Sequence, residues 1–402
     1  MNGDPVPVSP ALDFAPIALS ADDDLPADIV LLLVYHRLPP DVAEGLAAGL
    51  RIFPHLTGRI VEGDPPVLVP DPARVIRLET AASDEAMLPE DFSKLPFDEL
   101  SARFAPNGRD GSLFSAKRVD FPRTGTATLC LRISHRVVDG TGLGLFLAHA
   151  TAASRGGAAP PVIHDRAALA PPSSPPHGVP AGYLECPDGL APAPDVLAAG
   201  TPLWFAVRVT GAANMPGAEG GASSMRNHLA AWLCGETARI HPPFRQVAVW
   251  CGTRGNGGAP HTYTGNAGCY LHLDISGDDA LLARSIQSLA SRSGLARARE
   301  THRDVLRLLA AGRAVRWCGP RDDLLQLNLL SPPVEVADFG AGRPAFALLL
   351  ARNSSGLRIS PGVCGTRFLI EATLPPGVAA ALAKAGAERG LDIDVWGGGL
   401  AG

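Results

Sequence analysis

Residues 126–141 read TATLCLRISHRVVDGT, and this stretch decides how the rest of the chain is interpreted. Apolar residues alternate with others through Leu131 and Ile133, which is the period of two that indicates a β-strand. The alternation ends at His135, and a segment with helical spacing starts soon after Asp139. By parity His135 continues the face of Leu131 and Ile133, so we expect its imidazole to leave the strand end toward the interior.

The spacing of the histidine and the carboxylate allows two interpretations. An imidazole titrates near neutral pH, so His135 is a candidate general base, and Asp139 is a candidate for orienting the ring or for tying down the loop. We expect Gly140 to supply the conformational freedom of the turn and Thr141 to cap a helix over 141–153. The alternative is structural, with a hydrogen-bonded histidine at a strand end and an aspartate in a turn. These residues alone leave both interpretations open.

Strand and helix patterns mix along the whole chain, which indicates the α/β class. Short apolar runs predict four further strands, and patterns with a period of 3.6 predict four further helical regions. We expect one helical region to break near Gly294 and another, over 223–240, to start at a serine cap. The predicted strands are 29–35, 244–253, 343–353 and 366–374, and the predicted helical regions are 40–50, 223–240, 279–313 and 377–390.

A proline-rich stretch divides the chain into two halves. Between residues 160 and 202, 11 of 43 residues are proline and no amphipathic period survives, which is typical of an extended connector. We therefore predict an N-terminal domain over 1–159 that carries the histidine motif, a connector over 160–202, and a C-terminal domain over 203–402. A length of 402 residues suits two domains.

Composition excludes several classes of function. Hydrophobic residues make up 46% and charged residues 19%, with a formal net charge of −5, which fits a globular protein and argues against a nucleic-acid partner. The seven cysteines are scattered singly and the histidines lack metal-ligand spacing, so we expect neither a disulfide framework nor a bound metal. The sequence shows no signal-peptide pattern and no apolar run long enough for a bilayer, so we expect a cytoplasmic protein without membrane contact.

Lysine supplies only 3 of 35 basic residues, a coding bias that indicates a bacterial source.

Four further segments share a resemblance to one family. Residues 50–60, LRIFPHLTGRI, resemble the YPLAGR segment near the start of BAHD acyltransferases, and residues 264–271, TGNAGCYL, resemble their GN segment. Residues 335–344, EVADFGAGRP, resemble the DFGWG motif, and residues 223–233, SSMRNHLAAWL, look like the family helix with a late tryptophan. With HRVVDG at 135–140 as the HxxxDG motif, five matches occur in family order along most of the chain. The chain therefore resembles a divergent BAHD acyltransferase.

The resemblance implies a fold of two similar α/β domains of the chloramphenicol acetyltransferase type, with mixed sheets and flanking helices. In this family a long crossover loop joins the domains and a solvent channel runs between them, and the stretch 160–202 stands where that crossover is expected. The related condensation domains have two adjacent histidines in the motif. Here Ser134 precedes His135, so the BAHD type is the closer match. Family members are typically monomeric, and we expect a monomer.

The resemblance also implies roles for individual residues. His135 matches the histidine that removes a proton from an acceptor hydroxyl or amine, which then attacks a thioester carbonyl, usually of an acyl-CoA. Asp139 matches an aspartate that holds the loop and faces away from the substrate. Asn266 of the GN segment is a candidate substrate-binding residue. Asn328 and Ser331 lie where the family often has a Ser/Thr-Trp pair, and they are candidates for contacting the substrate or the oxyanion.

The DFGAG segment carries a further structural prediction. Asp338 matches an aspartate that pairs with an arginine in the family, in a turn formed with Gly340 and Gly342. Arg254 in CGTRG is the candidate partner, because it lies near the position of that arginine. The family tryptophan of this motif is Ala341 here, which weakens any inference about donor or acceptor specificity.

The acyl donor is expected to be a co-substrate, and we expect no bound cofactor. Five arginines between residues 292 and 307 are candidates for the phosphates of coenzyme A, or for an acidic carrier protein that bears phosphopantetheine. A solvated helix face is the plain alternative for the same arginines.

Three functions are compatible with these residues. The first is an acyltransferase of secondary metabolism that makes an ester or an amide of a small-molecule acceptor. The second uses a carrier-protein thioester to condense or release a polyketide or peptide chain. The third is a repurposed cyclase or binding protein, because fold alone does not fix function.

Overall fold

The computed structural model divides the chain into two compact units. Unit 1 comprises Met1–Ala170, Ala259–Ala267 and Pro332–Ala351, and unit 2 comprises Pro171–Gly258, Gly268–Ser331 and Arg352–Gly402. Two short segments from the second half of the sequence therefore belong to unit 1. The residues that the structure describes are 4–10, 12–20, 23, 27–37, 39, 42–63, 65–108, 111–169, 178–185, 201–209, 221–255, 258–275, 277–313, 315–317, 324–329, 333–350, 356–361, 367–374 and 377–396.

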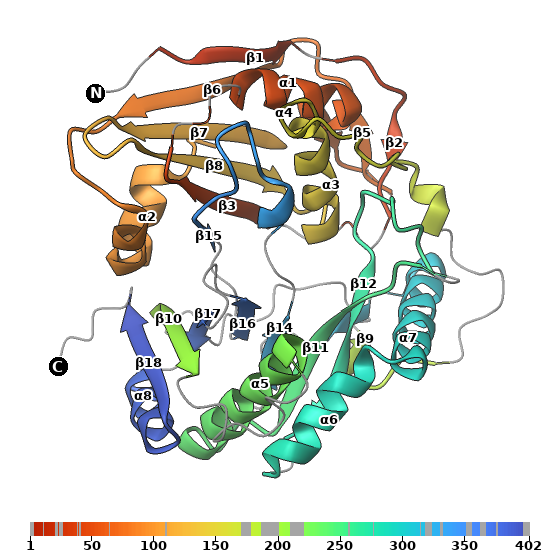
Figure 1. Cartoon of the computed structure of the whole chain (residues 1–402). Coiled ribbons are helices and arrows are strands. Elements are labelled where there is room, and N and C mark those ends of the chain that lie inside the picture. The colour runs from red at the N-terminus through yellow and green to blue at the C-terminus, as the bar shows by residue number, and fades with distance from the viewer. Residues whose placement is uncertain are drawn as a thin grey trace. The chain divides into compact units, whose positions relative to one another are not determined.

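A mixed six-stranded sheet forms the centre of unit 1 (Figure 1). The strand order is β1-β6-β7-β8-β3-β15, with β6 and β7 parallel and all other neighbours antiparallel. β8 carries the motif at its end and lies between β7 and β3, so hydrogen bonds on both edges hold it in register. The strands are β1 (Val6–Pro10), β3 (Asp28–Tyr35), β6 (Val75–Ala82), β7 (Phe114–Phe121), β8 (Thr126–Ser134) and β15 (Phe346–Leu349).

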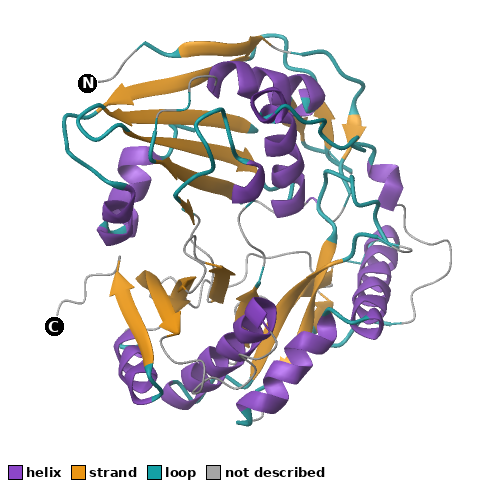
Figure 2. Ribbon diagram, viewed as in Figure 1, coloured by secondary structure: helices purple, strands orange, loops and turns teal. Residues whose placement is uncertain are grey.

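Helices α1 (Val42–Ile52) and α3 (Gly140–Ala150) lie side by side next to this sheet (Figure 2). Their buried side chains share one core with it. Leu46 of α1, Phe146 of α3 and Leu131 of β8 are all fully buried in that core. The burial of these apolar side chains fixes where α3 begins relative to the end of β8. The smaller elements of unit 1 are β2 (Ile17–Ala18), β4 (Arg59–Val61), β5 (Val67–Val69), α2 (Phe97–Phe104), α4 (Ala152–Arg155), η2 (Pro54–Thr57), η3 (Pro89–Lys94), η4 (Arg166–Leu169) and η7 (Val334–Val336).

Unit 2 contains a mixed seven-stranded sheet in the order β12-β11-β14-β16-β17-β10-β18, and its core includes residues of helices α5, α6, α7 and α8. β9 and β13 form a separate two-stranded sheet. The strands are β9 (Tyr183–Glu185), β10 (Thr201–Val209), β11 (Gln246–Gly252), β12 (Gly268–Asp274), β13 (Val315–Trp317), β14 (Leu324–Asn328), β16 (Gly356–Pro361), β17 (Arg367–Leu374) and β18 (Leu391–Trp396), and the helices are α5 (Gly221–Ile240), α6 (Asp279–Leu289), α7 (Arg292–Ala310) and α8 (Val378–Glu388).

The predicted elements are confirmed in type and in approximate position. The four further strands appear as β3, β11, β15 and β17, and the helical regions appear as α1, α5, the pair α6 and α7, and α8. The predicted break near Gly294 lies slightly earlier, at residues 290–291, where Ser291 caps α7 by accepting a hydrogen bond from the Gly294 amide. Helix α5 begins at Gly221, so the expected serine cap is wrong.

Two predictions about the start of α3 are also wrong. The N-cap is Asp139 rather than Thr141, because the Asp139 carboxylate accepts the hydrogen bond of the Gly142 amide. Gly140 is the first residue of α3, its φ is outside the left-handed region, and no atom lies within 4 Å of the place where a Cβ would stand. The turn therefore does not depend on the conformational freedom of glycine at this position.

Candidate active site

The backbone of His135 is fixed on both sides. Its N–H donates to the carbonyl of Ala27 at 2.8 Å, and its carbonyl accepts a hydrogen bond from Nδ2 of Asn266 at 2.7 Å. The residue follows directly after β8 and is half-buried, and its Nδ1 is buried with no hydrogen-bonding partner among the described residues. The imidazole thus starts from an immobilised peptide at a strand end while part of the residue stays accessible to solvent.

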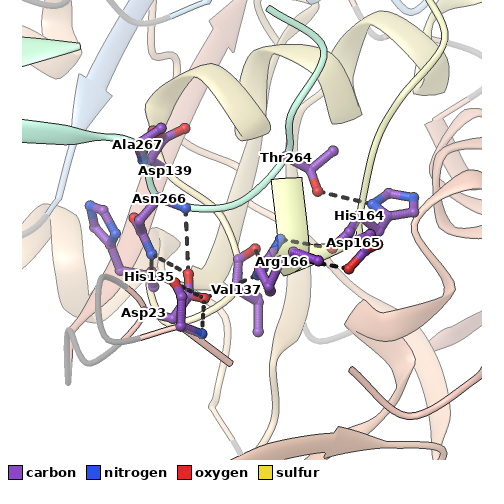
Figure 3. Close-up of polar contacts among 12 residues, drawn as sticks. Asp23, His135, Val137, Asp139, His164, Asp165, Arg166, Thr264, Asn266 and Ala267 are labelled. Atoms are coloured by element: carbon purple, nitrogen blue, oxygen red, sulfur yellow. Dashed lines mark hydrogen bonds and ion pairs between the residues drawn. The ribbon is translucent and has the colours of Figure 1, made fainter. Parts of the chain in front are cut away.

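The carboxylate of Asp139 binds backbone amides and is 5% exposed. Oδ1 accepts from the amide of Gly142 at 2.9 Å, and Oδ2 accepts from the amide of Ala267 at 3.3 Å (Figure 3). The first bond caps α3, and the second ties the motif to the 259–267 segment, which is 128 positions away in sequence. These contacts make Asp139 a brace between the loop and that segment.

Asn266 is 1% exposed, and its side-chain amide is oriented by two acceptors. Nδ2 donates to Oδ1 of Asp23 at 3.1 Å as well as to the carbonyl of His135. Because both partners accept hydrogen bonds, the NH₂ group and not the amide oxygen must face them. Asn266 thus makes contacts with protein groups in the structure, and contact with a substrate stays a prediction.

Asp23, which accepts a hydrogen bond from the Asn266 amide, also forms a buried ion pair with Arg166. Oδ2 of Asp23 accepts from Nε of Arg166 at 3.0 Å, and the two side chains are 0% and 5% exposed. Arg166 also donates from Nη2 to the carbonyl of Val137 at 2.8 Å and from Nη1 to the carbonyl of His164 at 3.2 Å. Figure 3 shows the ion pair beside the turn that joins β8 to α3.

A group of rings lies at the far end of the same network. Nε2 of His164 donates to the carbonyl of Ile52 at 2.7 Å, so in the neutral ring Nδ1 accepts from the hydroxyl of Thr264 at 2.9 Å. The ring of His55 lies 4.6 Å from that of His164, is 1% exposed, and has no hydrogen-bonding partner for either nitrogen among the described residues. Burial is the main cause that lowers the pKa of His55 well below its ordinary value, and the nearby His164 and Arg166 act in the same direction.

The DFGAG segment folds into a turn that its own aspartate closes. Oδ1 of Asp338 accepts from the amides of Gly340 at 2.8 Å and Gly342 at 2.9 Å, and these glycines have φ values of +91° and +89°. Such φ values strain any residue with a Cβ, which explains both glycines. The turn is anchored because Phe339 is fully buried and the Tyr35 hydroxyl donates to the carbonyl of Ala337.

Three further predicted residues lie outside unit 1. Arg254 and Asn328 belong to unit 2, where Asn328 ends β14 and is half-buried, and Ser331 lies outside the described residues. The pairing of Arg254 with Asp338, and the substrate contacts of Asn328 and Ser331, therefore remain predictions. The structure brings together His135, Asp139, Gly140 and Asn266, and the turn of Asp338, Gly340 and Gly342 also belongs to unit 1.

The arginines of α7 are largely engaged by nearby groups of unit 2. Arg303 pairs with Glu300, and Arg307 pairs with Glu300 and Asp304 on the same helix. Arg297 and Arg299 donate to backbone carbonyls. These intramolecular contacts engage the guanidinium groups of four of the five arginines, and they give no support for a phosphate site there.

The described part of the chain contains neither a metal-binding cluster nor a membrane-spanning helix. Its histidine, cysteine and carboxylate side chains form no group of three or more that could hold a metal ion. Its helices include none that is both long and apolar enough to cross a membrane.

Sequence interpretation missed Asp23 and Arg166. Asp23 stands in the run ADDD, in which no pattern separates one aspartate from its neighbours. Arg166 falls in the stretch that we interpreted as an extended connector, where it begins η4 instead. Only the three-dimensional contact between segments 143 residues apart identifies the pair.

Comparison with solved structures gives strong matches in fold, whereas no protein-family model and no curated protein sequence matches the chain. Vinorine synthase matches with a TM-score of 0.69 at 16% identity, over 95% of this chain and 96% of that one. TRI101 of F. sporotrichioides, in complex with coenzyme A and T-2, matches with a TM-score of 0.70 at 15% identity, over 95% and 100%.

Condensation domains match over nearly the same length. The first condensation domain of the CDA synthetase has a TM-score of 0.61 at 16% identity, over 94% of this chain and 95% of that one. At such identities the matches establish the fold and leave the reaction to other arguments. The chain therefore has the two-domain α/β fold of the chloramphenicol acetyltransferase type that vinorine synthase, TRI101 and the condensation domains share.

Proposed function

We propose that this protein is an acyltransferase that moves an acyl group from a thioester, an acyl-CoA in the simplest case, to a hydroxyl or amine of a small-molecule acceptor in secondary metabolism. The fold supports the proposal, because vinorine synthase and a TRI101 that holds coenzyme A share it at 16% and 15% identity. The observation that carries the proposal is the place of His135, half-buried at the end of β8 with its backbone held at both ends.

His135 acts as general base in the proposed reaction. Its imidazole takes the proton from the acceptor hydroxyl or amine while the acceptor heteroatom forms a bond to the thioester carbonyl carbon. The tetrahedral intermediate then collapses, the carbon–sulfur bond breaks, and the departing thiolate recovers the proton from the imidazolium. The products are an ester or an amide and a free thiol. The acceptor attacks directly, so the proposal needs no covalent enzyme intermediate.

Other residues support this step. Asp139 binds the amide of Gly142 in α3 and the amide of Ala267, so it keeps the histidine loop in place and does not exchange protons in the reaction. The oxyanion of the intermediate needs a hydrogen-bond donor, for which we propose Asn328 or Ser331. We propose that Arg254 pairs with Asp338 and stabilises the turn formed with Gly340 and Gly342.

The test is thioester consumption that depends on His135. Purified protein is incubated with acetyl-CoA and longer acyl-CoAs together with panels of alcohols and amines, and mass spectrometry follows free coenzyme A and acylated acceptor. We expect His135→Ala and His135→Gln to lower the rate by about 10²- to 10⁴-fold, the usual contribution of a general base. His36→Ala is the matched control, because His36 is an exposed histidine at the end of β3.

The same experiment separates the competing functions. A rate that appears only with an acyl group loaded on a carrier protein would assign the protein to condensation or release instead of CoA-dependent transfer. Product that forms without any thioester, or at an unchanged rate in His135→Ala, would contradict the proposal and favour a repurposed fold.

A further inference from the structure

We propose that Asp23 and Arg166 are positioning residues for His135, which form a buried clamp on the turn that carries the base. This inference rests on the proposed function, because it assigns a role in the same reaction. Neither side chain has a hydrogen bond to the imidazole. They act on the backbone carbonyls of His135 and Val137, one through Asn266 and one directly.

The clamp reaches both ends of a three-residue turn. Asn266 bridges Oδ1 of Asp23 and the carbonyl of His135 through one NH₂ group, at 3.1 and 2.7 Å. Arg166 bridges Oδ2 of Asp23 and the carbonyl of Val137, at 3.0 and 2.8 Å. The carboxylate of Asp23 therefore fixes the position of the His135 carbonyl relative to the Val137 carbonyl.

The Asp23 carboxylate and the Arg166 guanidinium each make several hydrogen bonds. Oδ2 of Asp23 also accepts from the backbone amide and the hydroxyl of Ser20, at 2.9 and 2.8 Å. Arg166 uses Nε, Nη1 and Nη2 in separate hydrogen bonds. Burial of an ion pair seldom adds net stability compared with apolar residues, so its presence at this turn needs another explanation. Fixing the geometry of the base is that explanation.

Gly265 shows how closely the clamp is built. A Cβ at this position would lie 2.5 Å from Nη1 and 2.6 Å from Cζ of Arg166. Asp23 and Val137 hold the guanidinium, so it can move away from such a Cβ only by straining these hydrogen bonds. The glycine that precedes Asn266 therefore makes room for Arg166, and Gly265→Ala displaces the guanidinium without changing a charge.

Because the clamp acts on the backbone next to the imidazole, its loss should lower kcat and leave KM unchanged. Displacement of a catalytic group by about 1 Å lowers the rate of the chemical step by about 100-fold, while substrate binding at other contacts persists. We expect Asp23→Asn, Arg166→Met and Gly265→Ala to lower kcat by about 10- to 100-fold, with the KM for the acyl thioester unchanged within about twofold. Arg166→Lys should recover part of the loss, because it keeps the charge and one donor.

Two controls separate positioning from general destabilisation. Asp120→Asn breaks another ion pair of unit 1, Arg118–Asp120 at 2.8 Å, and should leave kcat unchanged. In a His135→Ala background, Asp23→Asn should cause no further loss of the residual rate, because its effect passes through the imidazole. A full additional loss in that background, or a change in KM alone, would overturn the clamp.

A spectroscopic readout keeps this inference separate from the proposed function. In NMR spectra of protein isotope-labelled at its 11 histidines, the imidazole signals of His135 are assigned by their disappearance in His135→Gln. Asp23→Asn and Gly265→Ala should shift those signals, and Asp120→Asn should not. If the wild type transfers no acyl group but the shifts occur, the proposed function fails and the clamp stands. Unshifted signals in folded Gly265→Ala would refute the clamp even in an active enzyme.

Discussion

Nδ2 of Asn266 lies 2.7 Å from the carbonyl oxygen of His135, although 131 positions separate the two residues in sequence. The same nitrogen lies 3.1 Å from Oδ1 of Asp23. The primary amide of Asn266 therefore connects three distant segments of the chain, and the geometry of the motif depends on a donor that faces two acceptors. This relationship makes the site sensitive to changes that preserve shape and alter only donors and acceptors.

Asn266→Asp is the sharpest change of that kind. It places a carboxylate oxygen against the carbonyl of His135 and the carboxylate of Asp23 in a buried setting, where an uncompensated charge costs about 3–5 kcal/mol. We expect the free energy of unfolding at pH 7 to fall by that amount in denaturant titrations. Asn107→Asp is the control, because Asn107 faces Glu79 on the exposed surface and should cost about 1 kcal/mol or less. Equal losses in the two variants would refute the buried contact.

Asp139→Ala tests the brace against an ordinary helix cap. Loss of an N-cap costs about 0.5–2 kcal/mol, and an unpaired buried amide at Ala267 adds about 1–3 kcal/mol. The matched variant is Asp278→Ala, because Asp278 caps α6 at an exposed position through the amides of Ala280 and Leu281. This variant should show only the cost of the lost N-cap. Thermal or denaturant unfolding measures both, and a smaller loss for Asp139→Ala would contradict the second bond.

Gly140 and Gly142, two positions apart at the start of α3, should respond to alanine in opposite ways. A Cβ on Gly142 would collide with the backbone carbonyl of Thr264, so Gly142→Ala should destabilise the protein by about 1–3 kcal/mol. Gly140→Ala meets no atom within 4 Å at the start of α3, so it should be neutral or stabilising by up to about 1 kcal/mol. Midpoints of urea unfolding compare the two, and a destabilised Gly140→Ala would show that the turn does require glycine.

Stability should fall on mild acidification because of His55. Burial keeps the pKa of His55 well below 6.5 in the folded chain. At a pH between this lowered pKa and 6.5, the unfolded chain therefore binds a proton that the folded chain does not. Stability therefore rises with pH across this window, and one pH unit below 6.5 the loss reaches about 1.4 kcal/mol. His164, whose pKa is also lowered mainly by burial, contributes in the same direction.

His55→Leu should flatten this pH dependence, since it removes the titrating group and two unpartnered buried nitrogens. We expect equal or higher stability than the wild type at pH 8 and a clear gain at pH 5.5, measured by chemical denaturation at each pH. His261→Leu changes an exposed histidine and should leave the slope unaltered. An unchanged slope in His55→Leu would show that His55 is not the group responsible.

The sequence allowed the element types and the motif segments to be predicted, because both are local properties. Alternation through Ile133 identified β8, and the order of the five segments implied the fold. The N-cap was assigned to Thr141 instead of Asp139, because both residue types favour caps and only the position of the Gly142 amide decides between them. Asp23 and Arg166 had no periodic or motif signal, since each acquires its role from a partner brought close by tertiary folding.

The assignment of residues 259–267 and 332–351 to the first unit has a consequence for the way this molecule can be cut or recombined. A fragment that stops at Ala170 lacks the edge strand β15, the amide that faces His135 and the amide that faces Asp139. Such a fragment is expected to refold poorly. Chimeras between distant relatives should succeed only when both inserted segments come from the same parent as the sheet that receives them.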